Sequence, residues 1–149
     1  MHITKFKSNQ IGQVLKHIER PLDRNYGNKN IDLDKTKDNY TLIDGNIDKI
    51  NDRVNEVKHL NRADVVKLVG VVITIPKDYN GDKNKFFEKT ASVFEERYGK
   101  DNIAYATVHF DEKTPHMHLG VIPITKDKDG HEKLCAKEVF NRTELQKMH

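Results

Sequence analysis

Ten residues of the chain, HFDEKTPHMH at positions 109 to 118, hold three of its eight histidines. His116 and His118 are two positions apart, so on a β-strand their side chains would point to the same face, about 7 Å apart. His109 precedes them across a short turn through Pro115, which would bring it beside the pair. Three neutral imidazoles can bind one divalent ion and leave one side of it free for substrate oxygens. The spacing therefore predicts a catalytic metal site.

Two carboxylates, Asp111 and Glu112, lie inside the same stretch. Either could orient a ligand imidazole or act as acid or base beside the ion. The alternative is that the three histidines are ordinary half-buried strand residues, but their convergent spacing favours the metal site. Imidazole binds Zn, Mn, Fe, Co, Ni and Cu, so the residue types do not select the ion.

The hydrophobic pattern indicates which elements would position these residues. Alternating or β-branched runs predict strands over 2–6, 39–43, 68–75, 103–110 and 116–124, with a short edge strand after the Asp129-Gly130 turn. Apolar residues at helical spacing predict helices over 8–20, 47–62, 84–98 and from about 137 onward. Strands 103–110 and 116–124 are joined by so few residues that they must be antiparallel neighbours. The predicted fold class is α+β, with a mainly antiparallel five-stranded sheet, helices on one face and the metal site on the open face.

Length and composition favour one polar domain over residues 1–149. One third of the residues are charged, and no run approaches the roughly 20 apolar residues that a membrane helix needs. With no secretory signal evident at the amino terminus, we expect a cytoplasmic protein. Residues 1–40 hold eight Lys/Arg against five Asp/Glu, whereas the rest holds eighteen of each. The chain ends at TELQKMH inside a predicted helix, so we expect a fragment of a longer protein.

Two parts of the sequence resemble a known family. Residues 98–125, YGKDNIAYATVHFDEKTPHMHLGVIPIT, are similar to the H-x-D-E-x-x-P-H-x-H motif and its flanks in the MobV (Pre/Mob plasmid recombination) relaxases, which are HUH endonucleases. GQVLKHIER, NIDLDKT and NYTL, within residues 12–43, resemble the amino-terminal motifs of that family. Together these parts cover about half of the chain, while the middle, 60–90, follows the family only loosely.

The resemblance implies a plasmid mobilization relaxase with an RRM-like palm. Such an enzyme nicks single-stranded or hairpin origin-of-transfer DNA at one site and on one strand, forms a covalent 5′-phosphate adduct and later rejoins the DNA. The resemblance places the metal ligands on His109, His116 and His118, with Mn²⁺ or Mg²⁺ as the expected ion, and the motif glutamate on Glu112. Asp111 is expected to orient a ligand imidazole. The host would be bacterial and the gene carried by a plasmid or another mobile element.

The resemblance also implies a nucleophile. The histidine of the family's first motif falls on His17, which lies at the margin of the apolar stripe of the helix over 8–20. A neutral imidazole can attack phosphorus without the deprotonation that a phenol needs. Tyr40, which matches a family tyrosine, is the alternative. We expect Glu19 to orient His17 and Arg20 to grip a phosphate.

The segment 21–38 is polar, contains Pro and Gly and shows no period, so it is predicted to be a long loop. Either it lies along DNA, with contacts from Arg24, Lys29, Lys35 and Lys37, or it is a solvated linker. The full-length protein is expected to dimerise and to meet a coupling protein. Two other functions stay open at this point: a rolling-circle replication initiator of the same superfamily, and a DNA-binding module with a structural metal.

Overall fold

The computed structural model describes residues 1–20 and 29–148, and Arg24 of the predicted DNA contacts therefore lies outside the described residues. Five strands form one sheet in which every neighbouring pair is antiparallel. Across the sheet the order is β1 (His2–Lys7), β3 (Val66–Thr74), β5 (His116–Val121), β4 (Ile103–His109) and β2 (Tyr40–Ile43). The predicted class, α+β with a five-stranded antiparallel sheet, is confirmed.

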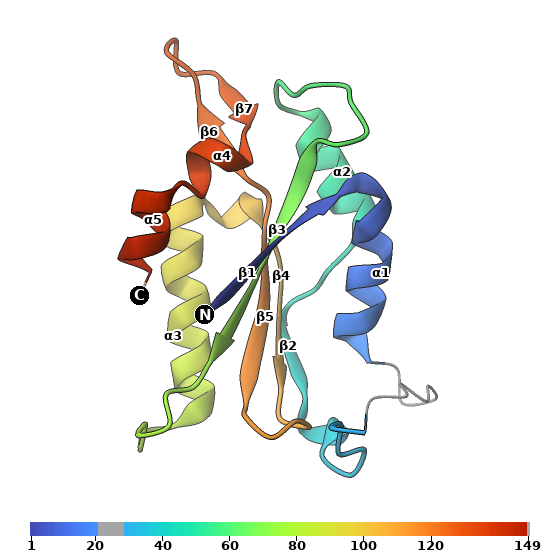
Figure 1. Cartoon of the computed structure of the whole chain (residues 1–149), viewed down its shortest axis with the longest axis vertical. Helices are drawn as coiled ribbons and strands as arrows, with labels where there is room; N and C mark the ends of the chain where they lie inside the picture. The colour runs from blue at the N-terminus through green and yellow to red at the C-terminus, as the bar shows by residue number, and fades with distance from the viewer. Residues whose placement is uncertain (21–28, 149) are drawn as a thin grey trace.

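Helices cover both faces of this sheet, so the predicted arrangement with helices on one face is wrong (Figure 1). One face carries α1 (Ser8–Glu19) and α2 (Ile47–Asn55), and the other carries α3 (Lys83–Tyr98), α4 (Ala136–Val139) and α5 (Arg142–Lys147). The physical reason lies in β3 and β4, which carry buried apolar side chains on both sides. In β3, Leu68 packs with α1 and α2, whereas Val69 and Val71 belong to the core beneath α3.

Each face has its own hydrophobic core. The stripe predicted for α1 is buried through Ile11, Leu15 and Ile18, and α2 adds Ile50 and Val54. Beneath α3 the buried residues include three helix positions and inner side chains of β4 and β5: Phe87, Ala91, Phe94, Val108, Met117 and Leu119. The sheet is thus held from both sides, which fixes the strands that carry the histidines.

The carboxy-terminal third departs from the prediction in two places. β6 (Ile124–Lys126) and β7 (Glu132–Leu134) form a separate two-stranded sheet instead of an edge strand of the main one. The last predicted helix is two short helices, because Asn141 caps α5 by accepting a hydrogen bond from the Glu144 N–H. Within residues 1–20 and 29–148, no helix has the length and apolar character to cross a membrane.

The predicted helix over 47–62 ends early, at Asn55. Val57 is still buried, but Leu60 is 64% exposed. The backbone of Lys58 pairs with the β6–β7 hairpin, accepting a hydrogen bond from the Leu134 N–H at 2.9 Å. A strand-like bridge to a distant segment therefore replaces the last helical turns. Two short 3₁₀ helices, η1 (Thr36–Asp38) and η2 (Lys100–Asn102), precede β2 and β4.

Candidate active site

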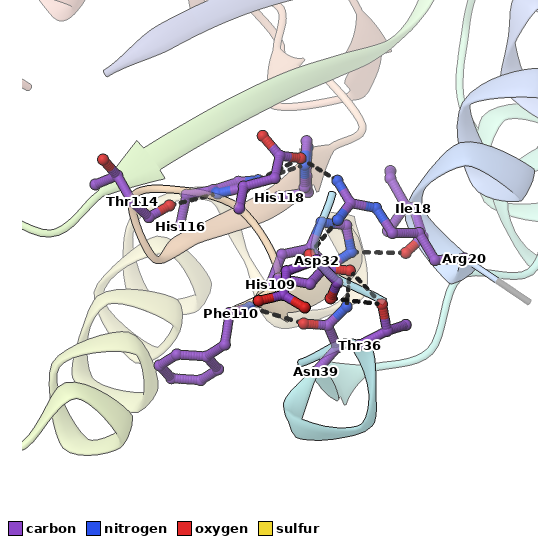
Figure 2. A network of polar contacts seen from close by, with 12 residues as sticks. Ile18, Arg20, Asp32, Thr36, Asn39, His109, Phe110, Thr114, His116 and His118 are labelled. Atoms are coloured by element: carbon purple, nitrogen blue, oxygen red, sulfur yellow. Dashed lines mark hydrogen bonds and ion pairs between the residues drawn. The ribbon is translucent and has the colours of Figure 1, made fainter. Parts of the chain in front are cut away.

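The three predicted metal ligands lie together on the sheet face that carries α1. His109 ends β4 and is paired in register with His116, the first residue of β5, and His118 follows two positions on. The ring centroids are 5.4 Å apart for His109 and His116, 4.8 Å for His109 and His118, and 4.9 Å for His116 and His118 (Figure 2). The centroid distance between His116 and His118 is shorter than the roughly 7 Å that separates alternate residues of a strand, because the two imidazoles lean toward each other.

Hydrogen bonds show which ring nitrogens carry lone pairs. The Nε2 atom of His109 is 2.8 Å from the carbonyl oxygen of Ile18, and the Nδ1 atom of His116 is 3.0 Å from that of Thr114. A carbonyl only accepts, so these nitrogens donate, and Nδ1 of His109 and Nε2 of His116 are left with lone pairs. That Nδ1 atom is buried and has no hydrogen-bond partner among the described residues.

The donor set fits a divalent ion. The Nε2 atoms of His116 and His118 are 3.1 Å apart. Bonds of about 2.1 Å to one ion would place two ligand nitrogens roughly 3.0 to 3.4 Å apart. An orphaned, buried ring nitrogen beside this pair is the arrangement that a cation would satisfy. Ligand atoms of all three histidines lie within 4.8 Å of one another.

Burial keeps two of these imidazoles neutral. Burial, aided by the charge of Arg20 and opposed by the hydrogen bond to the Ile18 carbonyl, lowers the pKa of His109 to about 4. Burial also lowers the pKa of His118 to about 3, aided by the neighbouring histidines. Only a neutral imidazole can bind a metal. Both side chains are therefore ready to act as ligands at neutral pH and well below it.

His17 faces this cluster from the last turn of α1. Its side chain is exposed, and its ring lies 6.1 Å from that of His118, nearly perpendicular to it. Both rings line a groove of about 400 Å³ between α1 and the sheet. The other lining residues are mostly apolar or amide side chains: Thr4, Phe6, Gln10, Gln13, Val14, Ile18, Gly70, Val71, Val72 and Tyr105. A molecule in this groove would meet His17 and the metal site together.

Tyr40, the alternative nucleophile, lies on the opposite face of the sheet. It pairs with Val108, whose side chain belongs to the core beneath α3, and its ring stacks 6.2 Å from Phe110. Its neighbour Thr41 points the other way, with its hydroxyl 3.3 Å from that of Thr107 on the histidine face. Burial raises the pKa of Tyr40, as do the charges of Glu88 and Asp82. A less acidic phenol on the far face does not favour attack at this metal site.

Arg20 does not fit the expected role of gripping a phosphate. It is only 3% exposed, and its two terminal nitrogens donate to the carboxylates of Asp111 and Glu112 (Figure 2). Its φ of 43° makes it the sole non-glycine residue with positive φ in the described ranges. That left-handed backbone costs about 1 to 2 kcal/mol. Because this guanidinium is buried and each of its terminal nitrogens already pairs with a carboxylate, it is not exposed to a DNA phosphate.

Asp111 does not orient a ligand imidazole as expected. Its fully buried carboxylate accepts hydrogen bonds from Arg20, from the Thr36 hydroxyl at 3.0 Å and from the Asn39 amide at 2.8 Å. Burial by itself raises the pKa of Asp111, but the hydrogen bonds from Arg20, Asn39 and Thr36 outweigh it and hold the pKa below its usual value. Glu112 is half-buried, with its carboxylate 3.9 Å from Nε2 of His116, so it is the carboxylate that borders the metal site.

The remaining predicted residues lie at the margins of the site. Glu19 is exposed and lines a smaller hollow on the other side of the α1 terminus. It lies about 200° around the helix from His17, and no hydrogen bond joins the two side chains among the described residues, so its orienting role stays a prediction. Lys29, Lys35 and Lys37 are exposed, and the nearest charge to Lys35 is Asp32, with N and O 3.6 Å apart. These lysines remain candidates for DNA contact.

Three contributors were missed by sequence reasoning: the hydroxyl of Thr36, the amide of Asn39 and the carbonyl of Ile18. Asn39 also accepts the Phe110 N–H at 2.7 Å, so it bridges two residues of the hairpin after β4. Each contact joins positions more than 70 apart in the chain. Thr36 and Asn39 do stand in or beside the motif segments NIDLDKT and NYTL, which is the signal that could have marked them.

Comparisons with known proteins agree with this geometry. The family model described as plasmid recombination enzyme matches residues 1–149. Plasmid recombination enzyme type 3 of Staphylococcus aureus is 40% identical over 153 residues, which cover 93% of this chain and 36% of the relative. The type 2 enzyme of the same species is 46% identical over 131 residues, 79% of this chain and 30% of the relative. The plasmid recombination enzyme of Lactiplantibacillus plantarum is 38% identical over 156 residues, which cover 97% of this chain and 42% of the relative. The chain thus spans well under half the length of these relatives.

Solved structures of a related domain share the fold. The MobM relaxase domain (MOBV) bound to plasmid pMV158 oriT DNA, in a Mn-bound crystal structure at pH 6.8, superposes with a TM-score of 0.81 at 39% identity, covering 99% of this chain and 79% of that one. A Mn-bound crystal structure of the same relaxase domain at pH 4.6 gives a TM-score of 0.79 at 38% identity, with the same two coverages. The family match over all 149 residues, the identities and the shared fold lead to one conclusion: the chain belongs to the plasmid recombination enzyme family, as a relaxase domain of the MobV type.

Proposed function

We propose that residues 1–149 nick one DNA strand at a plasmid origin of transfer and later rejoin it. The observation that carries this proposal is the placement of His17 beside the three-histidine cluster, at the end of an apolar groove. The relatives are named plasmid recombination enzymes, and the MobM relaxase domain is bound to oriT DNA. Both support a DNA substrate for this chain.

The proposed reaction is a transesterification at phosphorus. A lone pair on the neutral His17 ring attacks the scissile phosphate, forming an N–P bond while the bond to the 3′ oxygen breaks. The His17 ring gives up the proton of its other nitrogen, the 3′ oxygen takes up a proton and leaves as a 3′-OH, and the 5′-phosphate stays on His17 as a phosphoramidate. Because the new bond conserves the phosphate ester energy, attack by a 3′-OH can later rejoin the strand.

The chain's own residues supply the rest of the site. His109, His116 and His118 would hold Mn²⁺ or Mg²⁺, which when bound stabilises negative charge on the phosphate oxygens. Glu112 borders this position and is the residue placed to exchange protons with the reacting groups. We assign Lys29, Lys35 and Lys37 to contacts with DNA phosphates, and Arg24 to the same role from outside the described residues.

The strand would reach His17 through the groove beneath α1. Its lining includes Phe6, Val14 and Val72, which offer apolar surface to a nucleoside, and Gln10 and Gln13, whose exposed side chains offer amides. Single-stranded nucleic acids bind by this combination of stacking surface and polar rim, with their phosphates left to charged groups. A paired duplex would not expose its bases to such a groove, which favours a single-stranded substrate.

The test is nicking of a supercoiled plasmid that carries a family origin of transfer, with Mn²⁺ or Mg²⁺, scored for a protein-linked 5′ end. His17→Phe should abolish the adduct, whereas Tyr40→Phe should retain it. An adduct that survives loss of His17 would refute the assignment. A replication-origin plasmid in parallel separates mobilization from replication initiation, and metal removal that spares folding and DNA binding but stops nicking would exclude a purely structural metal.

We further propose that residues 1–149 act as one catalytic domain, because both hydrophobic cores pack on the same sheet.

Since plasmid DNA is the proposed substrate, we place the protein in the bacterial cytoplasm. Dimerisation and contact with a coupling protein stay predictions for the longer protein. They are testable by light scattering and pull-down with the full-length chain.

A further inference from the structure

We propose that Arg20 is a positioning residue that fixes the nucleophile His17 and the metal ligand His109 relative to each other. It would do so by tying the end of α1 to the hairpin that follows β4. This inference rests on the proposed function, since it gives His17 and the metal site their roles. It replaces the phosphate contact that the sequence suggested for Arg20.

The first support is the backbone of Arg20 itself. Helices commonly end on a glycine when the chain turns into the left-handed region, because a Cβ is disfavoured there. Here an arginine takes that position, with φ of 43° and ψ of 67°. A glycine would satisfy the turn more easily, so the side chain must supply something that a glycine cannot. What it supplies is a bridge from one guanidinium to two carboxylates, Asp111 and Glu112.

The second support is that neighbouring residues at the helix end also touch the site. The His17 ring contacts the ring of His118, and the Ile18 carbonyl accepts the hydrogen bond of His109 Nε2. That hydrogen bond fixes which nitrogen of His109 faces the other two ligands. Because Ile18 lies between His17 and Arg20, a shift of the helix end would move the nucleophile and release His109 together.

The third support is that Asp111 is anchored from its other side. Its carboxylate accepts hydrogen bonds from the Thr36 hydroxyl and the Asn39 amide, and its backbone carbonyl accepts one from the Asp32 N–H at 2.7 Å. The segment around η1 therefore binds the Asp111 carboxylate from one side, through Thr36 and Asn39, and Arg20 at the end of α1 binds it from the other (Figure 2). Such a doubly anchored carboxylate gives Arg20 a rigid support, which positioning requires.

The experiment compares Arg20→Lys and Arg20→Gln with the wild type. Arg53 provides a matched control, since it also pairs with two carboxylates, Glu56 and Glu132, but remote from the histidine cluster. Four measurements are made: the kinetics of nicking an origin oligonucleotide (kcat and KM), the affinity for Mn²⁺ alone by calorimetry, the absorption spectrum of the Co²⁺-substituted protein, and the salt dependence of DNA binding. The absorption spectrum reports the geometry around the three histidines directly.

A positioning role predicts that both Arg20 variants lower kcat by roughly 10- to 100-fold and weaken Mn²⁺ binding by at least about 10-fold. It also predicts an altered Co²⁺ spectrum, with KM and the salt slope of DNA binding unchanged, while Arg53→Lys and Arg53→Gln nick normally. Should an Arg20 variant fail to fold, Asn39→Ala loosens Asp111 from the other side, and the same four readouts apply. Here a smaller loss in the same direction is expected.

Two results would overturn the inference. One is wild-type turnover and Mn²⁺ affinity in both Arg20 variants. The other is a raised KM with a salt slope reduced by about one, which would show that Arg20 contacts a phosphate. If the wild type itself does not nick origin DNA, the proposed function fails instead, and the Mn²⁺ affinities and Co²⁺ spectra still decide whether Arg20 positions the histidines.

Discussion

Acid should destabilise the metal-free protein through His109, and the size of the effect follows from its burial. Its pKa is about 4 in the folded protein, against an ordinary value of 6.5. Between those values the unfolded chain binds a proton that the native protein does not, so the free energy of unfolding falls as the pH falls through this window. Above about pH 6.5 both states leave His109 unprotonated, and this residue no longer makes the free energy of unfolding depend on pH. At pH 4.5 these two pKa values correspond to a loss of about 2.5 kcal/mol.

The assay is urea unfolding in the presence of EDTA at pH 7 and pH 4.5. His109→Gln is the informative variant, because a glutamine amide can still donate to the Ile18 carbonyl but does not titrate. Relative to this variant, the urea midpoint of the wild type should fall by roughly 0.8 to 2.5 M more on acidification, for slopes of about 1 to 3 kcal/mol per M. His131→Gln, at a side chain that is 77% exposed, serves as the control for replacing a surface histidine. Equal losses in wild type and His109→Gln would refute the buried neutral imidazole.

Three further outcomes are expected. Saturating Mn²⁺, at about 100 times its Kd, should stabilise the wild type by about 2.7 kcal/mol in thermal unfolding at pH 7, and His118→Ala should lose this gain. Gly120→Ala should destabilise by about 1 to 3 kcal/mol in urea, because the added Cβ would lie 2.4 Å from the buried Tyr105 ring. Gly12→Ala, inside α1 with its nearest contact at 3.8 Å, should instead stabilise by roughly 0.5 to 1 kcal/mol, and a loss there would contradict the helix packing.

Local spacing was enough to predict that the three histidines converge. His116 and His118 share a strand, and His109 lies on the strand joined to it by a short turn, so alternation and hairpin geometry alone bring the three rings together. The helix over 8–19 was equally readable, because its apolar stripe is complete within three turns. Features of this kind depend on residues a few positions apart, which is the range over which a sequence pattern carries structural information.

The structural predictions that are wrong or incomplete concern places where contacts between segments far apart in the chain determine the structure. The helix predicted over 47–62 stops at Asn55 because the backbone of Lys58 pairs with the β6–β7 hairpin, some 75 positions later in the chain. The sheet is covered on both faces because β3 and β4 each carry buried apolar side chains on both sides, a pattern that is visible for β3 in the run LVGVVITI. Arg20 and Asp111 are 91 positions apart, and no local pattern announces their contact.

The choice between His17 and Tyr40 depends on strand register, which the sequence left undetermined. Both residues match family motifs and both precede the histidine cluster in the chain. Register places Tyr40 opposite Val108, one position before His109, and side chains alternate along a strand, so Tyr40 and the three histidines point to opposite faces. Moving Tyr40 to the histidine face would require a one-residue slip that also exposes its core neighbours. His17 needs no such change, because the contacts of Ile18 and Arg20 already hold its helix end against the cluster.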